Sequence, residues 1–196
     1  NEKKTALAMF IDYNKPLRKI AEYKRGIWGV TPRNKEQTFG LNLLLDPDIQ
    51  VVSLVGQAGC GKTLLAVAAG LEQTIDLTGR TEPRYKKLLI SRPIQPMGKD
   101  LGYLPGTMED KMSPWIVPIK DNLLFLMDDD KDAMEMYFSK GVIDIEAITY
   151  IRGRSISNAF IIIDEAQNLT SHELKTIVTR VGENTKIVFT GDIEQI

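Results

Sequence analysis

Short uninterrupted apolar runs recur along this chain and alternate with longer segments of mixed polarity. A strand buried on both faces gives such a run, whereas a strand with one wet face alternates apolar and polar residues. The runs are Ile49 to Val55, Leu88 to Ser91, Val142 to Thr149, Phe160 to Asp164 and Ile187 to Thr190. Strands that alternate with helices are typical of parallel sheets. We therefore predict an α/β fold with a mainly parallel central sheet and helices on both faces.

The segments between these runs carry helical patterns. They are Lys35 to Leu45, Leu64 to Leu77, Met108 to Lys140 and Ser171 to Val181. The last is the best delimited, because Thr170 and Glu173 form a capping box and Gly182 follows its end. The apolar side chains between Met108 and Lys140 favour packing in a core or between subunits over a platform for stacking bases.

The N-terminal stretch has a different pattern. Two apolar runs, Ala6 to Tyr13 and Leu17 to Tyr23, surround the turn signal Asn14-Lys15-Pro16 and predict a small hairpin. A linker follows from Gly26 to Arg33. We predict a hairpin-like extension with its linker at residues 1–27 and one principal domain at 28–196, since 196 residues that are 43% hydrophobic suffice for one core.

Composition limits the partners and the setting. The net charge of −1, from 25 basic and 26 acidic residues, gives no global basic field, so any nucleic acid must meet a local patch. The single cysteine, Cys60, excludes an internal disulfide, and no apolar run approaches the roughly 20 residues that cross a membrane. We expect a cytoplasmic protein without membrane insertion. Because the chain begins at Asn1 and stops just after a candidate loop, we also expect a fragment truncated at both ends.

The segment Gly56 to Thr63 fits the phosphate-loop pattern G-x-x-x-x-G-K-[ST] between a predicted strand and a predicted helix. Glycines let backbone N–H groups wrap phosphates, and the helix N-terminus favours their charge. Lys62 is expected to reach the β- and γ-phosphates and is also a candidate catalytic residue, and Thr63 is expected to bind Mg²⁺. The predicted nucleotide-binding residues are Gly56, Gln57, Ala58, Gly59, Cys60, Gly61, Lys62, Thr63 and Leu64. The alternative, a glycine-rich turn without a ligand, is disfavoured by this context. The Cys60 thiol is better explained as a tolerated small residue than as a redox group.

Two carboxylates follow a strongly apolar strand. The run from Phe160 to Ile163 ends in Asp164 and Glu165, which places both acids at the carboxyl edge of a parallel sheet, where ligands bind. Asp164 is predicted to hold Mg²⁺, and Glu165 to orient and deprotonate an attacking water. The alternative is a pair of ordinary surface acids. The string Asp164 to Gln167 also resembles the DEAD-type box of helicases.

The last apolar strand also ends in polar groups. Thr190, Asp192 and Gln195 are predicted to sense the γ-phosphate and to relay its loss to a nucleic-acid or subunit interface, with Gln195 also a candidate catalytic residue. An ordinary strand and turn remains the alternative.

Together these residues resemble the PhoH family of P-loop ATPases, the phosphate starvation-inducible type, and most closely the ATPase half of PIN-PhoH proteins. The resemblance spans Trp28 to Ile196. The strings that carry it are Gly29 to Gln37, Gly56 to Thr63, Ser91-Arg92-Pro93, Tyr150 to Arg154, Asp164 to Asn168 and Gly191 to Gln195. It implies a RecA-like P-loop NTPase core related to superfamily one helicases, with ATP and Mg²⁺. It also implies that Gln37 reads adenine, against the alternative of a polar residue on an exposed helix face.

The resemblance further implies a larger protein. In PIN-PhoH proteins a PIN nuclease domain precedes this module, and RNA unwinding coupled to cleavage has been ascribed to the pair. No PIN domain lies within these residues. The family also continues beyond this chain's last residue, with an arginine suited to the nucleotide of a neighbouring subunit, so we expect full activity to need more chain than this.

Two functions from different classes therefore stay open. One is an ATP-driven motor or remodeller acting on RNA, which at this size would need a homo-oligomer such as a hexameric ring. The other is a nucleotide-dependent switch with little turnover that regulates a fused or partner domain. Arg92, Arg152 and Arg154 are candidate contacts to nucleic acid or to a neighbouring subunit, with solvated salt bridges as the alternative. A GTPase is disfavoured because Asp164 to Gln167 reads D-E-A-Q where a GTPase has D-x-x-G, and no Asn-Lys-x-Asp base reader appears. A small-molecule kinase remains an alternative, although it would not need Glu165 beside Asp164.

Overall fold

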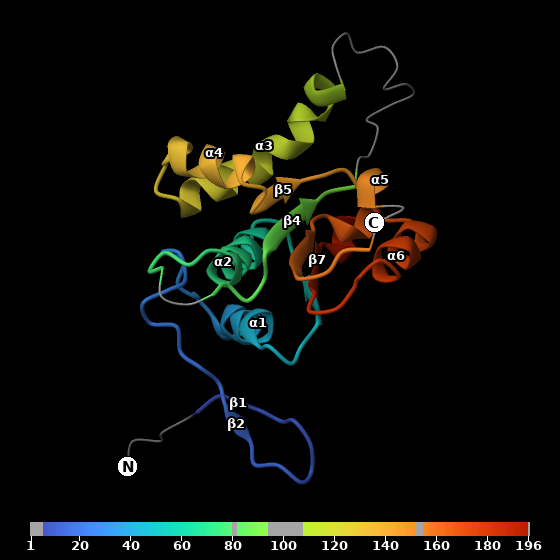
Figure 1. Ribbon diagram of the computed structural model, residues 1–196. Coiled ribbons are helices and arrows are strands. Elements are labelled where there is room, and N and C mark those ends of the chain that lie inside the picture. The colour runs from blue at the N-terminus through green and yellow to red at the C-terminus, as the bar shows by residue number, and fades with distance from the viewer. Residues whose placement is uncertain (1–5, 80–81, 94–107, 152–154, 196) are drawn as a thin grey trace.

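The computed structural model describes residues 6–79, 82–93, 108–151 and 155–195. Its centre is a parallel sheet of five strands in the order β3-β7-β6-β4-β5 (Figure 1). The strands are β3 (Val51–Val55), β4 (Lys87–Ser91), β5 (Ile143–Ile145), β6 (Ala159–Ile163) and β7 (Lys186–Gly191). The predicted α/β fold with a parallel central sheet is confirmed. Strand β3 lies at one edge and β5 at the other.

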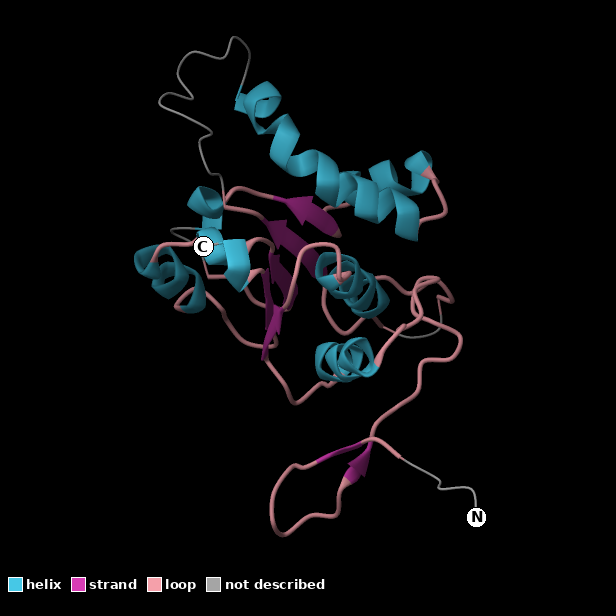
Figure 2. Ribbon diagram, turned by 180° about the vertical axis from the view of Figure 1, so that it is seen from behind, coloured by secondary structure: helices cyan, strands magenta, loops and turns pink. Residues whose placement is uncertain are grey.

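Helices cover both faces of the sheet (Figures 1 and 2). One face carries α1 (Lys35–Leu45), α2 (Lys62–Thr74) and α3 (Met108–Leu126), and the other carries α5 (Ile148–Ile151) and α6 (Ser171–Val178). Helix α4 (Lys131–Ser139) packs against α3 and β5. A hydrophobic core lies on each face of the sheet, and strand β6 contributes to both. Phe160 and Ile162 pack under α1, α2 and α3, whereas Ile161 and Ile163 pack under α5 and α6. Burial on both faces explains its uninterrupted apolar sequence.

Helix α2 approaches the sheet closely at Gly70. A Cβ atom at this position would lie 2.7 Å from Leu88 Cδ1 and 3.1 Å from Phe160 Cδ1. A glycine is therefore what lets the helix rest on β4 and β6. Because the chain enters α2 directly from the predicted phosphate loop, this packing fixes the loop relative to the sheet.

Three predicted boundaries were wrong. The strand predicted from Val142 to Thr149 ends at Ile145, and helix α5 begins at Ile148. The last hydrogen bond to β4 is donated by the Glu146 N–H to the Ile90 carbonyl oxygen. Helix α2 runs from Lys62 to Thr74 rather than from Leu64 to Leu77.

The capping box at Thr170 and Glu173 is confirmed, but α6 ends at Val178 rather than Val181. Val181 leaves the helix to pair with Ile156. A Cβ atom at Gly182 would lie 3.0 Å from the Ile156 carbonyl oxygen, so this glycine permits a close chain approach and does not cap the helix.

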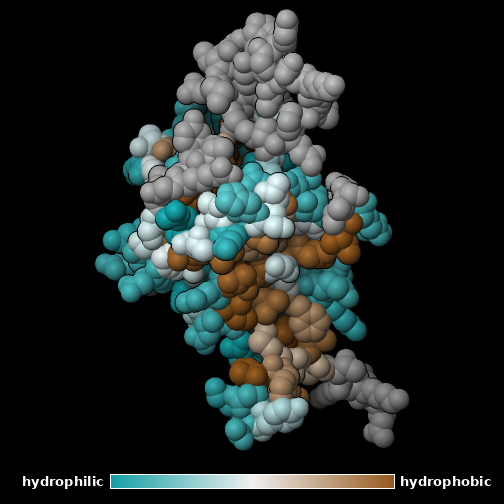
Figure 3. Space-filling model, turned by 90° about the vertical axis from the view of Figure 1, so that its right-hand side faces the viewer, coloured by the Kyte–Doolittle hydropathy of each residue, from teal (hydrophilic) through white to brown (hydrophobic). Residues whose placement is uncertain are grey.

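The predicted hairpin is present but short, with β1 (Ala8–Met9) antiparallel to β2 (Arg18–Lys19). It is attached to α1, because Arg18 pairs with Asp46 and the Ala21 N–H donates to Asn42 Oδ1 at 2.9 Å. Figure 3 shows a band of apolar surface running toward the end of the molecule where the hairpin lies. No helix in the described ranges has the length and apolar character needed to cross a membrane.

A lysine is fully buried where β7 begins. Lys186 is 0% exposed, and its Nζ donates to the carbonyl oxygens of Leu43 at 2.9 Å and Asp46 at 2.8 Å, where α1 ends. Burial lowers the pKa of Lys186 to about 8, although Asp46 acts to raise it. Burial alone would raise the pKa of Asp46, yet the Asp48 backbone N–H, Arg18 and Lys186 bring it below its ordinary value. This network joins the hairpin, α1 and β7.

Candidate active site

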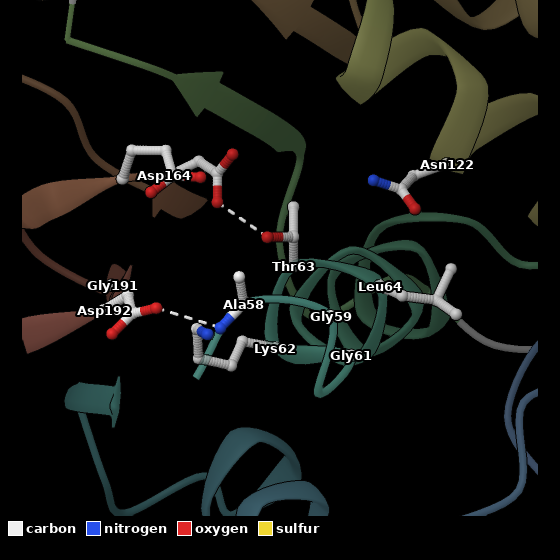
Figure 4. A pocket seen from close by; sticks show the side chains of 11 residues that line it. Ala58, Gly59, Gly61, Lys62, Thr63, Leu64, Asn122, Asp164, Gly191 and Asp192 are labelled. Atoms are coloured by element: carbon white, nitrogen blue, oxygen red, sulfur yellow. Dashed lines mark hydrogen bonds between the residues drawn. The ribbon is translucent and has the colours of Figure 1, made fainter. Parts of the chain in front are cut away.

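The carboxyl ends of β3, β6 and β7 surround a cavity of about 310 Å³ (Figure 4). Parallel strands deliver their following loops to one edge of the sheet, which is where ligands of open α/β sheets bind. The lining residues come from the predicted phosphate loop, from the acidic pair and from the end of β7, with Asn122 contributed by α3. The fold therefore brings three separate stretches of sequence to one place.

The loop between β3 and α2 has the backbone that its glycines predict. Gly59 and Gly61 have φ values of 77° and 83°, in the left-handed region that side chains rarely adopt. Gly61 is the N-cap of α2, and no side chain caps the helix there. Backbone N–H groups at this N-terminus suit an anion.

Lys62 spans the loop. Its Nζ donates to the carbonyl oxygens of Gly56 at 2.6 Å and Gln57 at 2.7 Å, and lies 3.6 Å from Cys60 Sγ. A lysine side chain has rotatable donors on a flexible stem, so the same ammonium can turn from these carbonyls to a phosphate.

Asp164 connects the phosphate loop to β7 through hydrogen bonds. It is 4% exposed, and its Oδ1 accepts hydrogen bonds from Thr63 Oγ1 at 2.7 Å and from Thr190 Oγ1 at 2.6 Å. Figure 4 shows Thr63 and Asp164 facing one another across the cavity. A hydroxyl beside a carboxylate is an oxygen donor set that fits Mg²⁺. Among the described residues there is no group of three or more His, Cys, Asp or Glu side chains suited to a metal, so such an ion would complete its shell with water and phosphate oxygens.

Glu165 follows in an unusual conformation, with φ 52° and ψ 43°. Its Oε2 accepts from Gln167 Nε2 at 2.6 Å and its Oε1 from Arg92 Nη2 at 3.4 Å. Arg92 also lies 3.9 Å from Asp164 Oδ2, with its side chain 24% exposed. The structure thus brings Arg92 to the acidic pair, and its predicted contact with nucleic acid stays a prediction.

The end of β7 connects to both sides of the site. Asp192 Oδ2 accepts from the Ala58 N–H of the phosphate loop at 2.9 Å, and the Asp192 N–H donates to Gln167 Oε1 at 3.1 Å. Gln195 ends the short helix η3 (Ile193–Gln195), and its side chain lies outside the described part, as do Arg152 and Arg154 entirely.

Gln37 lies next to the phosphate loop. Its Nε2 donates to the Cys60 carbonyl oxygen at 3.1 Å and its Oε1 accepts from the Arg33 N–H at 2.6 Å. A second cavity, of about 430 Å³, opens here, with Leu64 and Phe125 in its wall. The Phe125 side chain is 63% exposed. The structure therefore places Gln37 in the wall of a cavity beside the phosphate loop, and its recognition of adenine stays a prediction.

Three residues at the site had no role in the sequence prediction: Asn122 and Phe125 line the cavities, and Gln167 contacts Glu165. Asn122 and Phe125 belong to the region interpreted as packing, where an asparagine within an apolar helical pattern was the available signal. Gln167 was noted only as part of a motif string. Its contact with the Asp192 N–H, just after β7, joins residues 25 positions apart in the sequence.

Known proteins match this chain over most of its length. Residues 29–196 match the family described as PhoH-like protein. Protein PhoH2 of Bacillus subtilis is 58% identical over 172 residues, which cover 87% of this chain and 38% of that protein. Protein PhoH2 of Thermobispora bispora is 39% identical, with the same coverage of 87% and 38%. The PhoH-like protein of Bacillus subtilis is 36% identical over 72% of this chain and 42% of its own.

The chain thus spans about 38% of the length of the curated PhoH2 relatives. Among solved structures, that of C. elegans PCH-2 matches 86% of this chain and 41% of its own at 14% identity, with a TM-score of 0.37, a likeness too slight to bear on the fold. The family match, the high identity to PhoH2 proteins and the phosphate-loop geometry agree. This chain is a P-loop protein that belongs to the PhoH-like family.

Proposed function

We propose that this chain binds ATP with Mg²⁺ and hydrolyses it to ADP and phosphate. The observation that carries the proposal is the hydrogen bond between Thr63 and Asp164, at 2.7 Å. It joins the end of the phosphate loop to the strand that bears the acidic pair, although the two residues are far apart in sequence. A phosphate-binding backbone and a metal-binding oxygen pair thereby share one cavity.

Each side chain has a defined task in this proposal. The loop N–H groups and Lys62 hold the phosphates, while Thr63 and Asp164 hold Mg²⁺, which supplies neutralisation of phosphate charge when bound. Glu165 accepts a proton from a water as its oxygen attacks the γ-phosphorus, and ADP leaves on the opposite side. Thr190 and Asp192 touch Asp164 and the loop respectively, which suits residues that respond to the γ-phosphate.

The cavity at Gln37 is proposed to take the adenine base. A glutamine amide can donate to and accept from an adenine edge, and the ring of Phe125 offers a face on which a purine can stack. Both groups lie in the wall of a cavity that also contains Cys60 and Gly61 of the phosphate loop.

We further propose that hydrolysis drives RNA unwinding or remodelling in a longer protein, which carries a fused PIN domain and assembles as a ring. The support is the family resemblance and the greater length of the PhoH2 relatives, of which this chain covers 38%. Arg92 is the described candidate for an RNA or inter-subunit contact, because it borders the acidic pair. The competing proposal is a nucleotide-dependent switch with little turnover.

The decisive experiment compares Glu165→Gln with the wild type and with Glu183→Gln, an exposed control. We expect Glu165→Gln to lower the ATP hydrolysis rate by about 10²- to 10⁴-fold, because a general base is removed. ATP affinity should stay within about twofold, because the loop and the metal-binding oxygens are intact.

Failure of the wild type to bind ATP would overturn the proposal, and unchanged hydrolysis by Glu165→Gln would exclude Glu165 as the base. ATP hydrolysis rates with and without single-stranded RNA then distinguish an RNA motor from a nucleotide-dependent switch. A motor is stimulated by RNA and loses that stimulation in Glu165→Gln, whereas a switch still regulates its partner domain in this variant.

A further inference from the structure

Glu165 has a backbone conformation that contacts with other residues must stabilise. Its φ of 52° and ψ of 43° place a residue with a side chain in the left-handed region, which costs roughly 1–3 kcal/mol. Such a conformation persists where surrounding contacts determine it, and these outliers concentrate at functional sites. The residue that would supply the base is thus held by its neighbours rather than by its own preference.

Gln167 is the closest of those neighbours. Its Nε2 donates to Glu165 Oε2 at 2.6 Å, and its Oε1 accepts the backbone N–H of Asp192 at 3.1 Å. A planar amide that donates at one end and accepts at the other has its orientation fixed by both partners. Gln167 therefore bridges the Glu165 carboxylate and the end of β7.

The neighbouring glycine leaves room for this bridge. A Cβ atom at Gly191 would lie 2.8 Å from Gln167 Oε1, closer than real Cβ contacts come. The φ of Gly191 is not in the left-handed region, so conformational freedom is not what its position requires. The absence of a side chain here matches the space that the Gln167 amide occupies.

The bridge continues to the phosphate loop. Asp192, whose N–H meets Gln167, accepts the Ala58 N–H with its own carboxylate at 2.9 Å. A connected path therefore leads from Ala58 through Asp192 and Gln167 to Glu165. Its first member belongs to the loop that wraps phosphates and its last to the acidic pair.

We propose that Gln167 is a positioning residue that fixes the Glu165 carboxylate relative to the phosphate loop. The proposal rests on the proposed function, because it takes Glu165 as the base that receives the proton of the attacking water. Gln167 itself does not line the cavity in which the phosphates and the water would lie. It acts by holding Glu165 Oε2 at 2.6 Å, whereas Oε1 has only the longer contact of 3.4 Å to Arg92.

The kinetic test uses Gln167→Ala, with Gln50→Ala as an exposed control on the far side of β3. Single-turnover ATP hydrolysis should slow by about 10- to 100-fold in Gln167→Ala, since displacing a catalytic group by about 1 Å costs this much. ATP affinity and thermal stability should stay near the wild-type values. A loss of affinity or stability that matches the loss of rate would show a merely structural role and overturn the proposal.

A double-mutant cycle with Gly191→Ala tests the bridge itself. Gly191→Ala should also slow hydrolysis, because the added methyl group displaces the Gln167 amide oxygen. Once residue 167 is alanine, the nearest atoms to that methyl group are the backbone nitrogens of residues 167 and 166, at an ordinary 3.5 Å and 3.8 Å. The two effects should then be strongly non-additive, whereas additive effects would contradict a shared bridge.

The two proposals fail in different ways. If Glu165→Gln loses hydrolysis but Gln167→Ala does not, the proposed function stands and the role of Gln167 is wrong. If the wild type does not hydrolyse ATP, the proposed function fails, and an NMR measurement decides the bridge alone. The side-chain amide protons of Gln167, identified by their loss in Gln167→Ala, should shift in Glu165→Ala but not in Glu183→Gln. Resonances that do not respond would overturn the bridge.

Discussion

The two halves of the site are built in opposite ways. The phosphate loop, Gly56 to Thr63, is one continuous stretch whose geometry comes from its own glycines and from the helix that follows. The acidic half is assembled from side chains of β6, η2 (Ala166–Asn168) and β7, and its contacts reach across the sequence to Thr63 and Ala58. The turn of the loop comes from neighbouring residues, although Asp192 and Gln37 also hydrogen-bond to it, whereas the acidic half is formed by residues far apart in the sequence.

This difference predicts how each half fails. A change in the loop should act on binding, because the loop holds the phosphates directly. A change in the acidic half should act on hydrolysis or on stability, because that half depends on strand order and core packing. Four variants can break or sharpen this division.

The largest effect is expected from Lys62→Met. It keeps the length of the side chain but removes the ammonium, which makes charge-assisted contacts to phosphate in the proposed complex. We expect ATP affinity to fall by about 100-fold, because hydrogen bonds to charged groups contribute about 1.5–3 kcal/mol each. Isothermal titration measures this change, with Lys86→Met as an exposed control. Equal affinity in Lys62→Met and wild type would contradict the role of the loop.

The second variant, Lys186→Met, tests how much the buried Lys186 ammonium at the start of β7 contributes to stability. Strand β7 carries Thr190 of the acidic half at its other end. The pKa of Lys186 lies near 8 in the folded protein and near 10.5 in the unfolded chain, so between these values the unfolded chain binds more protons. Stability from this lysine therefore rises with pH across that window. Between pH 7 and 9.5 the wild type should gain up to about 2 kcal/mol relative to Lys186→Met.

Urea unfolding at the two pH values measures the gain, with Asp46 and Arg84 unchanged in both proteins. If the unfolding free energies of wild type and Lys186→Met change in parallel with pH, Lys186 has the same charge in the folded and the unfolded chain, and the prediction is wrong.

The smallest effect comes from the two glycines inside helices. Gly70→Ala should destabilise the protein by about 1–2 kcal/mol, since overpacking against Leu88 and Phe160 outweighs the gain in helix propensity. Gly40→Ala is the matched case, because its Cβ would meet only Leu54 Cδ2 at an ordinary 3.5 Å. It should stabilise the protein by about 0.5–1 kcal/mol. Thermal unfolding of both variants checks the opposite signs, and the same sign in both would contradict the packing argument.

The sequence predicted the local parts of this molecule well. The apolar strand segments, α1 from Lys35 to Leu45 and the capping box at Thr170 follow from patterns within a few residues. The parallel pairing of the strands was inferred from their alternation with helices. The end of β5 was mispredicted because the local pattern there is ambiguous. The apolar residues after Ile145 enter the core as a helix, and an apolar run alone does not distinguish a strand from a buried helix.

The acidic half shows where such inference stops. Asp164 and Glu165 could be found because they end a buried strand. The task of Gln167 could not, since it depends on the Asp192 backbone and on the empty space at Gly191. Asn122 and Phe125 likewise reach the cavities only through the packing of α3 against α2.

Strand β3 bears the phosphate loop, yet within the described part of the chain it lies at an edge of the sheet, with Val51 58% and Val55 60% exposed. Edge strands open more readily than central ones, and their amides exchange with solvent and admit proteases sooner. A ligand that binds only the folded form, at 100 times its dissociation constant, adds about 2.7 kcal/mol of stability. With ATP bound as proposed, the resistance of this strand to digestion would follow the nucleotide supply, and the lifetime of the protein would report the energy state of its surroundings.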